Sequence, residues 1–267
     1  MILSGNLIKM KSEFNTPIDY HLMLGNDELY LNGFIGKHIS LKHNGVINCV
    51  VCGKQTKKSF ADGYCYSCFQ TAPMADPSVV SPELSMAQFG IARDMEWAEQ
   101  HDLIDHFVYL SITSGVKVGV TRHHQIPTRW IDQGASRAIK LAKTPNRHIA
   151  GLIETQLKKH VADKTNWQAM LKDQVENAPD LIEKKKELSE ILHPELQKYL
   201  LPDNQITAIE YPGTFVLETV TSIGFDKQPF VEGVLARIKG QYLIFDNNKV
   251  INIRKHSGYY ITFEGSE

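Results

Sequence analysis

The sequence predicts an α+β protein that combines a zinc ribbon, a ββαβα domain and a small C-terminal β-barrel or sandwich. Three observations support this fold class. The four cysteines form two Cys-x2-Cys pairs separated by twelve residues. Residues 106–175 pass from the period-two pattern of strands to the longer apolar period of helices. Residues 204–267 contain short apolar runs separated by glycines, which is typical of small all-β regions.

The cysteine pairs are the most specific motif. Cys49, Cys52, Cys65 and Cys68 are the only cysteines in the chain. A two-residue spacer lets one tight turn aim both sulfurs at one ion, and the longer spacer allows a hairpin to bring back the second pair. We therefore expect one structural Zn²⁺ with four protein ligands and no position for a reactive water. Two disulfides are the alternative, and they require an oxidising compartment.

Composition favours a cytoplasmic globular protein. Of the 267 residues, 42% are hydrophobic and 22% are charged, and the length is sufficient for about two domains. Residues 1–6 lack the basic and apolar regions of a signal peptide. No apolar run approaches the ~20 residues that a membrane helix requires, so we expect no membrane partner.

The net charge of −1 conceals a strong asymmetry. Residues 106–172 carry eleven basic and three acidic residues, a net charge of +8, so the rest of the chain carries −9. Such a block is the electrostatic footprint of a nucleic-acid site, and a solvated basic face is the alternative. The basic residues are Lys117, Arg122, Arg129, Arg137, Lys140, Lys143, Arg147, Lys158, Lys159, Lys164 and Lys172; the acidic ones are Asp132, Glu154 and Asp163.

Proline and glycine residues mark turns and loops, and their positions predict six regions. They are an N-terminal β region (1–48), a zinc ribbon (49–70), a linker with a helix at 85–100 (71–105), the ββαβα domain (106–175), a helical connector (176–203) and a C-terminal β domain (204–267). In the C-terminal domain we expect strands at 206–211, 215–223, 231–239, 241–245 with 250–254, and 259–263.

The ββαβα domain has a clear local pattern. A turn at 113–115 joins strands at 107–112 and 116–121, which predicts a hairpin. Pro127 suits the first turn of a short helix that ends at Gly134, and a third strand follows at 138–143. An apolar stripe then marks a second helix, formed by Ile149, Ile153, Leu157 and Val161.

These elements, with their polar residues, resemble the GIY-YIG nuclease domain. The resemblance rests on Val108-Tyr109-Leu110, Lys117-Val118-Gly119, Arg129, Glu154 and Asn166. It implies a GIY-YIG-like domain with Tyr109, Lys117, Arg129, Glu154 and Asn166 as catalytic residues and a divalent metal such as Mg²⁺ at Glu154. Lys117 stands where the family's second motif usually has a tyrosine.

Phosphodiester hydrolysis needs a base, a cation on the phosphate oxygens and usually a metal. A cation such as Lys117 can lower the pKa of Tyr109, and Gly119 opposite the tyrosine leaves room for a phosphate. Arg129 would bind the phosphate. The alternatives are a half-buried strand tyrosine at 109, a surface acid at Glu154 and a helix cap at Asn166.

Most of the chain also resembles the bacterial domain of unknown function 2797. The matching segments are Lys58-Ser59-Phe60 with Gly63-Tyr64-Cys65-Tyr66, and residues 110–122, 126–135, 162–167 and 239–245. This resemblance implies an architecture and no activity. Many members of the family carry further cysteines in the stretch matching 75–101, which has none here, so we expect no second zinc site.

Three functions remain open. The first is a zinc-containing protein that binds DNA or RNA through Arg122, Arg129, Arg137, Lys140 and Lys158. The second is a metal-dependent endonuclease with Tyr109 as base and Glu154 as metal ligand. The third is a non-catalytic scaffold that binds proteins through the zinc ribbon and the C-terminal domain.

Overall fold

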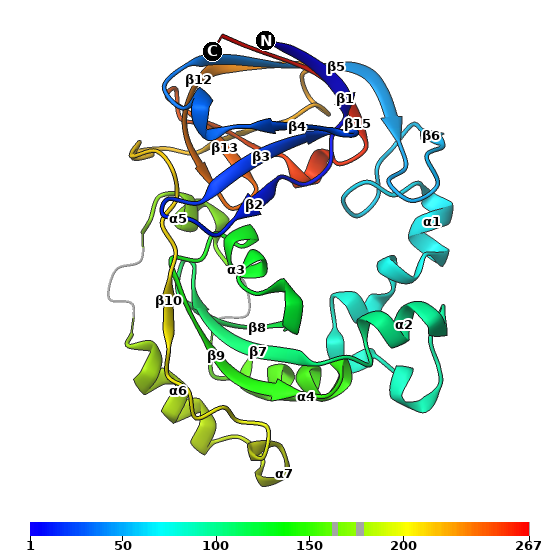
Figure 1. Ribbon diagram of the computed structural model, residues 1–267, viewed down its shortest axis with the longest axis vertical. Helices are drawn as coiled ribbons and strands as arrows, with labels where there is room; N and C mark the ends of the chain where they lie inside the picture. Colours follow the sequence, from blue (N-terminus) through cyan, green and yellow to red (C-terminus); the bar gives the residue numbers. More distant parts are fainter. Residues whose placement is uncertain (162–164, 175–178, 267) are drawn as a thin grey trace. The chain divides into compact units, whose positions relative to one another are not determined.

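The protein folds as two compact units, which Figure 1 shows in sequence colours. The computed structural model describes residues 1–161, 165–174 and 179–266. One unit comprises Met1–Gln70 with Glu210–Glu267, and the other comprises Thr71–Ile209. Asp163 and Lys164 of the basic block lie outside the described residues. Three sheets accompanied by several helices confirm the α+β class.

The first unit is built on an eight-stranded sheet that joins the two ends of the chain. Its order is β1-β15-β5-β12-β13-β14-β11, with β6 also paired to β5. The strands are β1 Ile2–Asn6, β5 His38–Asn48, β6 Gln55–Thr56, β11 Thr221–Ile223, β12 Phe230–Lys239, β13 Tyr242–Phe245, β14 Lys249–Asn252 and β15 Tyr259–Gly265. The N-terminal β region and the C-terminal strands therefore share one hydrogen-bonded sheet. Closure of this sheet into a barrel stays a prediction.

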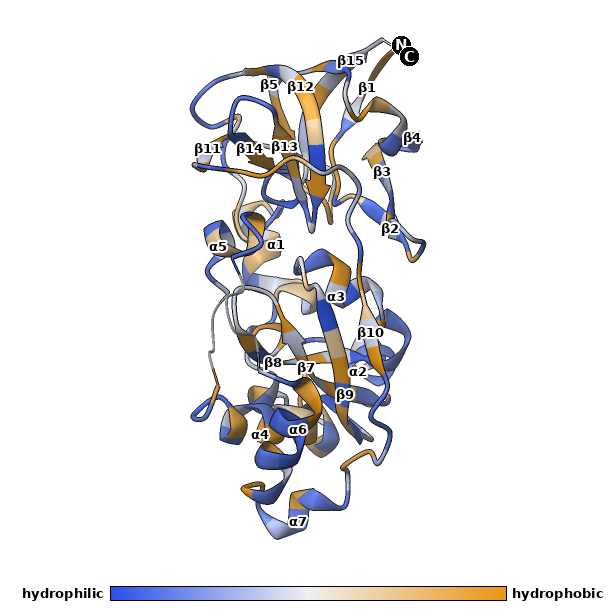
Figure 2. Ribbon diagram, turned by 90° about the vertical axis from the view of Figure 1, so that its left-hand side faces the viewer, coloured by the Kyte–Doolittle hydropathy of each residue, from blue (hydrophilic) through white to orange (hydrophobic). Residues whose placement is uncertain are grey.

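A three-stranded sheet completes the first unit. It consists of β2 Lys11–Glu13, β3 Asp19–Leu24 and β4 Asp27–Tyr30, paired antiparallel in that order. Alternate residues of β3, including Tyr20, Leu22 and Leu24, are buried, as the period of two requires. Figure 2 shows how apolar residues concentrate on strands such as β13, whose Leu243, Ile244 and Phe245 are fully buried.

The second unit has a four-stranded antiparallel sheet with the order β10-β9-β7-β8. Its strands are β7 His106–Ile112, β8 Val116–Arg122, β9 Arg137–Thr144 and β10 Ile206–Ala208. With α3 Thr128–Asp132 and α4 Arg147–Leu157, the predicted ββαβα order is observed. Leu110, Ile153 and Leu188 belong to one core, so α4 and α6 Leu181–Glu190 cover the same face of the sheet.

Several local predictions differ from the structure. Of the strand expected at 215–223, only β11 Thr221–Ile223 forms. Strand β10 pairs with β9 and not with the C-terminal strands, because the preceding connector already hydrogen-bonds to β9 through Leu201 N and Leu141 O at 2.9 Å. The helical connector expected at 176–203 is not one continuous helix, because it is interrupted between α6 and α7 Pro194–Gln197. His193 caps α7 by accepting from Glu195 N, and Pro194 opens its first turn.

Residues 71–105 form a chain of short turns, so the helix expected at 85–100 is wrong in its first half. The helical part is α2 Met95–His101, which begins after Asp94 because that side chain accepts from Trp97 N. Gly90, with φ of +75°, ends the preceding turn. The turns are η2 Pro73–Ala75, η3 Pro77–Val79, η4 Pro82–Leu84 and η5 Ala87–Phe89; the remaining elements are α1 Tyr66–Thr71, α5 Trp167–Leu171, η1 Asn32–Phe34, η6 His123–Gln125 and η7 Arg254–His256. Among the described helices, none has the length and apolar character to cross a bilayer.

Turn η4 packs directly against the backbone of helix α4. A Cβ added at Gly151 would lie 2.1 Å from Glu83 N and 2.4 Å from the carbonyl carbon of Pro82. Only glycine permits this approach without a shift of backbone atoms. The contact therefore fixes the position of Glu83 beside α4.

Replacing Gly151 by alanine should lower stability. Alanine normally favours a helix interior over glycine by ~1 kcal/mol, but overpacking against η4 costs about 1–3 kcal/mol. We expect Gly151→Ala to lower the urea midpoint, whereas Leu152→Ala at the exposed neighbouring position should change it little. A higher midpoint for Gly151→Ala would contradict this packing.

Candidate functional site

The four cysteines meet at one point of the first unit. Their sulfur atoms all lie within 4.8 Å of one another, and those of Cys52 and Cys65 are 3.9 Å apart. Tetrahedral zinc with Zn–S bonds of about 2.3 Å places its sulfurs roughly 3.8 Å apart, whereas a disulfide needs ~2.05 Å. All four are free cysteines. Together they could bind one zinc ion, and the disulfide alternative is wrong.

Backbone geometry preorganises the first cysteine pair. Gly53 has a φ of +70°, and its N–H donates to Cys49 O at 2.9 Å. Burial opposes ionisation of Cys49, but backbone N–H groups of Cys52 and Cys65 lower its pKa to about 6. Burial and the neighbouring thiols raise the pKa of Cys68 to about 12. A divalent ion would stabilise all four thiolates, because metal ligation displaces thiol protons.

The cysteine cluster is anchored to the C-terminal part of the large sheet. Asn48 N donates to Gly258 O at 2.8 Å, and Arg254 Nε lies 3.1 Å from the Asp62 carboxylate. A Cβ at Gly258 would lie 2.2 Å from Asn48 O. The segment that carries the cysteines is thus held against η7 and β15. This location favours a structural role for the metal.

A second group with suitable distances lies on the small sheet. Glu13, His21 and Glu28 also place their ligand atoms within 4.8 Å of one another. Lys11 Nζ lies 3.1 Å from Glu13 and 2.8 Å from Glu28. The ammonium group offsets part of the charge of these exposed carboxylates, and His21 Nδ1 lies 2.9 Å from Glu28, so the group is an ion-pair cluster of the protein's own side chains.

In the second unit, Tyr109 pairs with Gly119 across the β7–β8 hairpin, as predicted. A Cβ at Gly119 would lie 2.6 Å from Tyr109 Oη. The phenol therefore fills the space above the glycine. This differs from the expectation that Gly119 leaves room for a phosphate.

Tyr109 is fully buried beneath α3. Its ring meets Trp130 edge-on with centroids 5.9 Å apart. Burial raises the pKa of Tyr109, and the charge of Arg129 only partly opposes this. Arg129, and not the expected Lys117, is the cation that most opposes the rise in this pKa. The phenol is therefore a hydrogen-bond donor or acceptor at neutral pH and not a ready base.

Gln133 links Tyr109 to Arg129, a connection that sequence reasoning missed. With its amide oxygen toward Arg129, Gln133 accepts from Nε and Nη2 at 3.3 Å and donates to Tyr109 Oη at 2.8 Å. The sequence indicates this contact through the position of Gln133 four residues after Arg129, because residues four apart are neighbours on a helix surface. The amide fixes the orientation of the guanidinium.

Glu154 lies on α4 and is only 8% exposed. Burial raises its pKa; the charge of Lys158, whose Nζ is 3.6 Å away, opposes the rise, and Glu83 adds to it. Lys117 also opposes the rise through its charge. Mg²⁺ usually keeps several waters in its shell. A carboxyl group covered in this way offers little room for a hydrated ion.

Asn166 caps helix α5. Its Oδ1 accepts from Gln168 N at 3.1 Å and from Ala169 N at 3.2 Å. Its own N–H donates to Ser114 Oγ at 2.9 Å, in the turn of the hairpin. The helix-cap interpretation accounts for these contacts.

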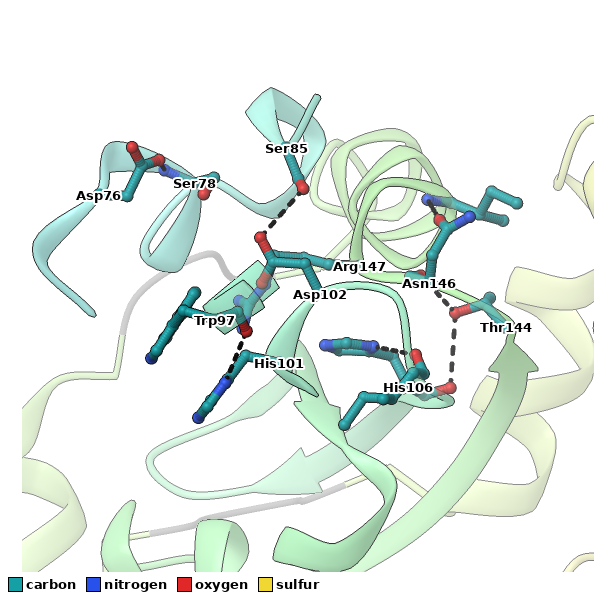
Figure 3. Close-up of polar contacts among 12 residues, drawn as sticks. Asp76, Ser78, Ser85, Trp97, His101, Asp102, His106, Thr144, Asn146 and Arg147 are labelled. Carbon is teal, nitrogen blue, oxygen red and sulfur yellow. Dashed lines mark hydrogen bonds and ion pairs between the residues drawn. The ribbon is translucent and has the colours of Figure 1, made fainter. Parts of the chain in front are cut away.

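Three arginines gather near the junction of α2 and β7. Arg147 pairs with buried Asp102 at 2.5 Å, and Figure 3 shows that Ser85 also donates to this carboxylate, at 3.2 Å. Burial lowers the pKa of Arg122, and the charges of Arg147 and Arg129 lower it further. Among the described residues, no carboxylate lies within ion-pair distance of Arg122 or Arg129. These two arginines, which we call the arginine pair, have no carboxylate in direct contact among the described residues, although the charge of Asp102 acts on Arg122 and opposes the fall in its pKa.

The other predicted binding residues differ in their availability. Arg137 is exposed on β9. Lys140 Nζ lies 5.4 Å from the centroid of the Phe107 ring, which is within cation–π distance. Lys158 is engaged with Glu154. Burial, with the charges of Arg122 and His123, also lowers the pKa of His124, so the basic surface near β8 is arginine-based.

Removing one cysteine should remove the metal. We expect one zinc per chain by elemental analysis, and less than one after Cys49→Ser, because three thiolates bind more weakly than four. Val51→Ala, at an exposed position between two ligands, is the matched control and should retain zinc. The circular dichroism of the sheets should persist in chelator. Two zinc ions per chain, or none, would contradict the site.

The comparisons with known proteins add one finding. No curated protein and no solved structure matches the chain. The family model described as "Protein of unknown function (DUF2797)" matches residues 36–261, which include the cysteine cluster and the ββαβα segment. The chain therefore belongs to the DUF2797 family.

Proposed function

We propose that the protein binds nucleic acid through the arginine pair and that its zinc site is structural. The observation that carries the proposal is that neither Arg122 nor Arg129 forms an ion pair with a carboxylate among the described residues, while the charges of Arg147 and Arg129 both act on half-buried Arg122. Two like charges repel, so their proximity is costly unless an anion compensates them. A phosphate group supplies that charge.

The chemistry of both side chains suits a phosphodiester. Guanidinium groups bind phosphate oxygens through two parallel hydrogen bonds. Arg122 is half-buried, which strengthens its interaction with an anion because the local dielectric is lower than in water. Gln133 orients Arg129. Arg137 and Lys140 extend the positive charge along β9, as a polyanion requires.

We favour binding over cleavage. The ββαβα order and the Tyr109–Gly119 register support a GIY-YIG-like scaffold. The chemical groups argue against turnover, because Tyr109 and Glu154 are both buried with raised pKa values. The expected base is protonated, and the expected metal ligand lies beside η4 and Lys158. On this proposal the nuclease scaffold serves as a binding module.

Replacing the arginine pair should weaken binding and flatten its salt dependence. We expect Arg122→Gln with Arg129→Gln to lower affinity for labelled DNA or RNA at least about tenfold, because each charged hydrogen bond contributes ~1.5–3 kcal/mol. The slope of log affinity against log salt should fall by roughly 1.4–1.8, since each phosphate contact contributes ~0.9 on duplex DNA and ~0.7 on single strands. Fluorescence anisotropy across a salt series measures both.

The control for this double variant is Lys184→Gln with Lys186→Gln on α6. It removes the same charge from a helix outside the proposed interface, and it spares Lys185, which is buried and donates to Asp203 O. An equal loss of affinity in the control would contradict the location of the interface. Wild-type protein that binds neither DNA nor RNA at low salt would contradict the function.

Replacing Tyr109 by phenylalanine separates binding from catalysis. Tyr109→Phe removes one buried hydrogen bond to Gln133, so we expect a loss of stability of ~1 kcal/mol. Affinity for nucleic acid should stay within about twofold of wild type, because the hydroxyl touches no phosphate on this proposal. Magnesium-dependent cleavage by wild type that disappears in Tyr109→Phe would instead support the endonuclease.

A further inference from the structure

A cavity of about 370 Å³ lies in the segment of short turns that precedes β7. Its apolar wall includes Leu84, Met86, Ile91 and Trp97. Leu84, Met86 and Ile91 are 56%, 43% and 62% exposed. Ligand cavities typically measure ~300–1,000 Å³. This one has room for one large side chain or two.

Exposed apolar residues are unusually dense in this segment. Seven of them lie between residues 74 and 91, and Val80 is 83% exposed. They are Met74, Val79, Val80, Leu84, Met86, Phe89 and Ile91. Single exposed apolar residues need no explanation, but a concentration of them around a cavity indicates a binding surface. We call residues 73–102 with this cavity the apolar–acidic surface.

The polar wall of the cavity is rigid. Arg93 Nε lies 3.0 Å from Asp76, and its Nη1 donates to Ala72 O at 3.0 Å. Asp102 also lines the cavity and is held by Ser85 and Arg147 (Figure 3). Trp97 stacks on His101 with ring centroids 4.1 Å apart and planes 4° apart. Because these side chains are fixed by internal partners, a ligand would lose little entropy in ordering them.

The charge of the segment restricts its occupant. Residues 71–105 contain seven acidic residues and one basic residue, a net charge of −6. Arg147 and Lys143, from outside the segment, pair with Asp102 and Asp105, so these two positive charges bring the net charge from −6 to −4. Nucleic acid and anionic lipid surfaces are repelled by such a surface. A second copy that docked the same surface against itself would bring like charges together. A basic partner is attracted.

We propose that the apolar–acidic surface binds a lysine- or arginine-rich peptide segment of a partner protein, with one large apolar side chain of that segment seated in the cavity. Charge complementarity attracts the segment, and burial of the apolar anchor against Ile91 and Met86 supplies the affinity. This site shares no residue with the arginine pair, and the proposal does not depend on the proposed nucleic-acid function.

The probe is a short fluorescein-labelled lysine-rich peptide with one central leucine, compared with the same peptide carrying alanine instead. By anisotropy we expect the leucine peptide to bind wild type at least about tenfold tighter than the alanine peptide, because the anchor carries the affinity. Ile91→Asp should lose that advantage although it adds a negative charge. Leu152→Asp, which adds the same charge at an exposed position of α4, should keep it.

Trp97 provides a second measurement that does not depend on the fold of the Ile91→Asp variant. The leucine peptide should change the tryptophan emission of wild type, and this change should disappear in Trp97→Phe, which retains an aromatic wall. Equal affinity for both peptides, or unchanged binding by Ile91→Asp, would overturn the proposal. Concentration-dependent self-association that Ile91→Asp abolishes would assign the surface to a second copy of the chain and overturn it as well.

Discussion

The buried ion pair between Asp102 and Arg147 is the interaction on which the second unit depends. It joins the end of α2 to the start of α4, and Ser85 satisfies a further acceptor site of the carboxylate. Removing one partner of such a pair costs about 3–5 kcal/mol because the other charge stays buried. The pair also withdraws Arg147 from solvent. Arg122 and Arg129 are left without a carboxylate in direct contact among the described residues, although the charge of Asp102 also acts on Arg122.

The same ion pair stands at the boundary between two opposite charge distributions. Residues 71–105 carry −6 and residues 106–172 carry +8. Asp102 belongs to the acidic segment and Arg147 to the basic segment, so their ion pair holds the two segments together. We propose that the remaining acidic residues attract a cationic peptide and that the remaining basic residues attract nucleic acid. Electrostatic steering would then direct an anion and a cationic peptide to different surfaces of one unit.

Local sequence signals predicted local structure well. The hairpin register at Tyr109 and Gly119 followed from turn length, Gly134 ends α3 with φ of +72°, and the cysteine spacing predicted their cluster. The pairing of β15 with both β1 and β5 could not be predicted, because strands carry no local mark of a distant partner. The helix expected at 85–100 begins only at Met95, because Asp94 supplies its N-cap whereas the Ser85 hydroxyl donates to Asp102.

The candidate site shows why residue identity in a motif does not determine chemistry. Tyr109, Arg129 and Glu154 occupy the expected elements, yet catalysis depends on solvent access and pKa, which sequence spacing does not encode. Turn η4 reaches α4 only because Gly151 has no side chain. That contact places Glu83 near Glu154. The charge of Glu83 then raises the pKa of Glu154 beyond the effect of burial alone. A packing contact from outside the ββαβα segment therefore changes the ionisation of a residue within it.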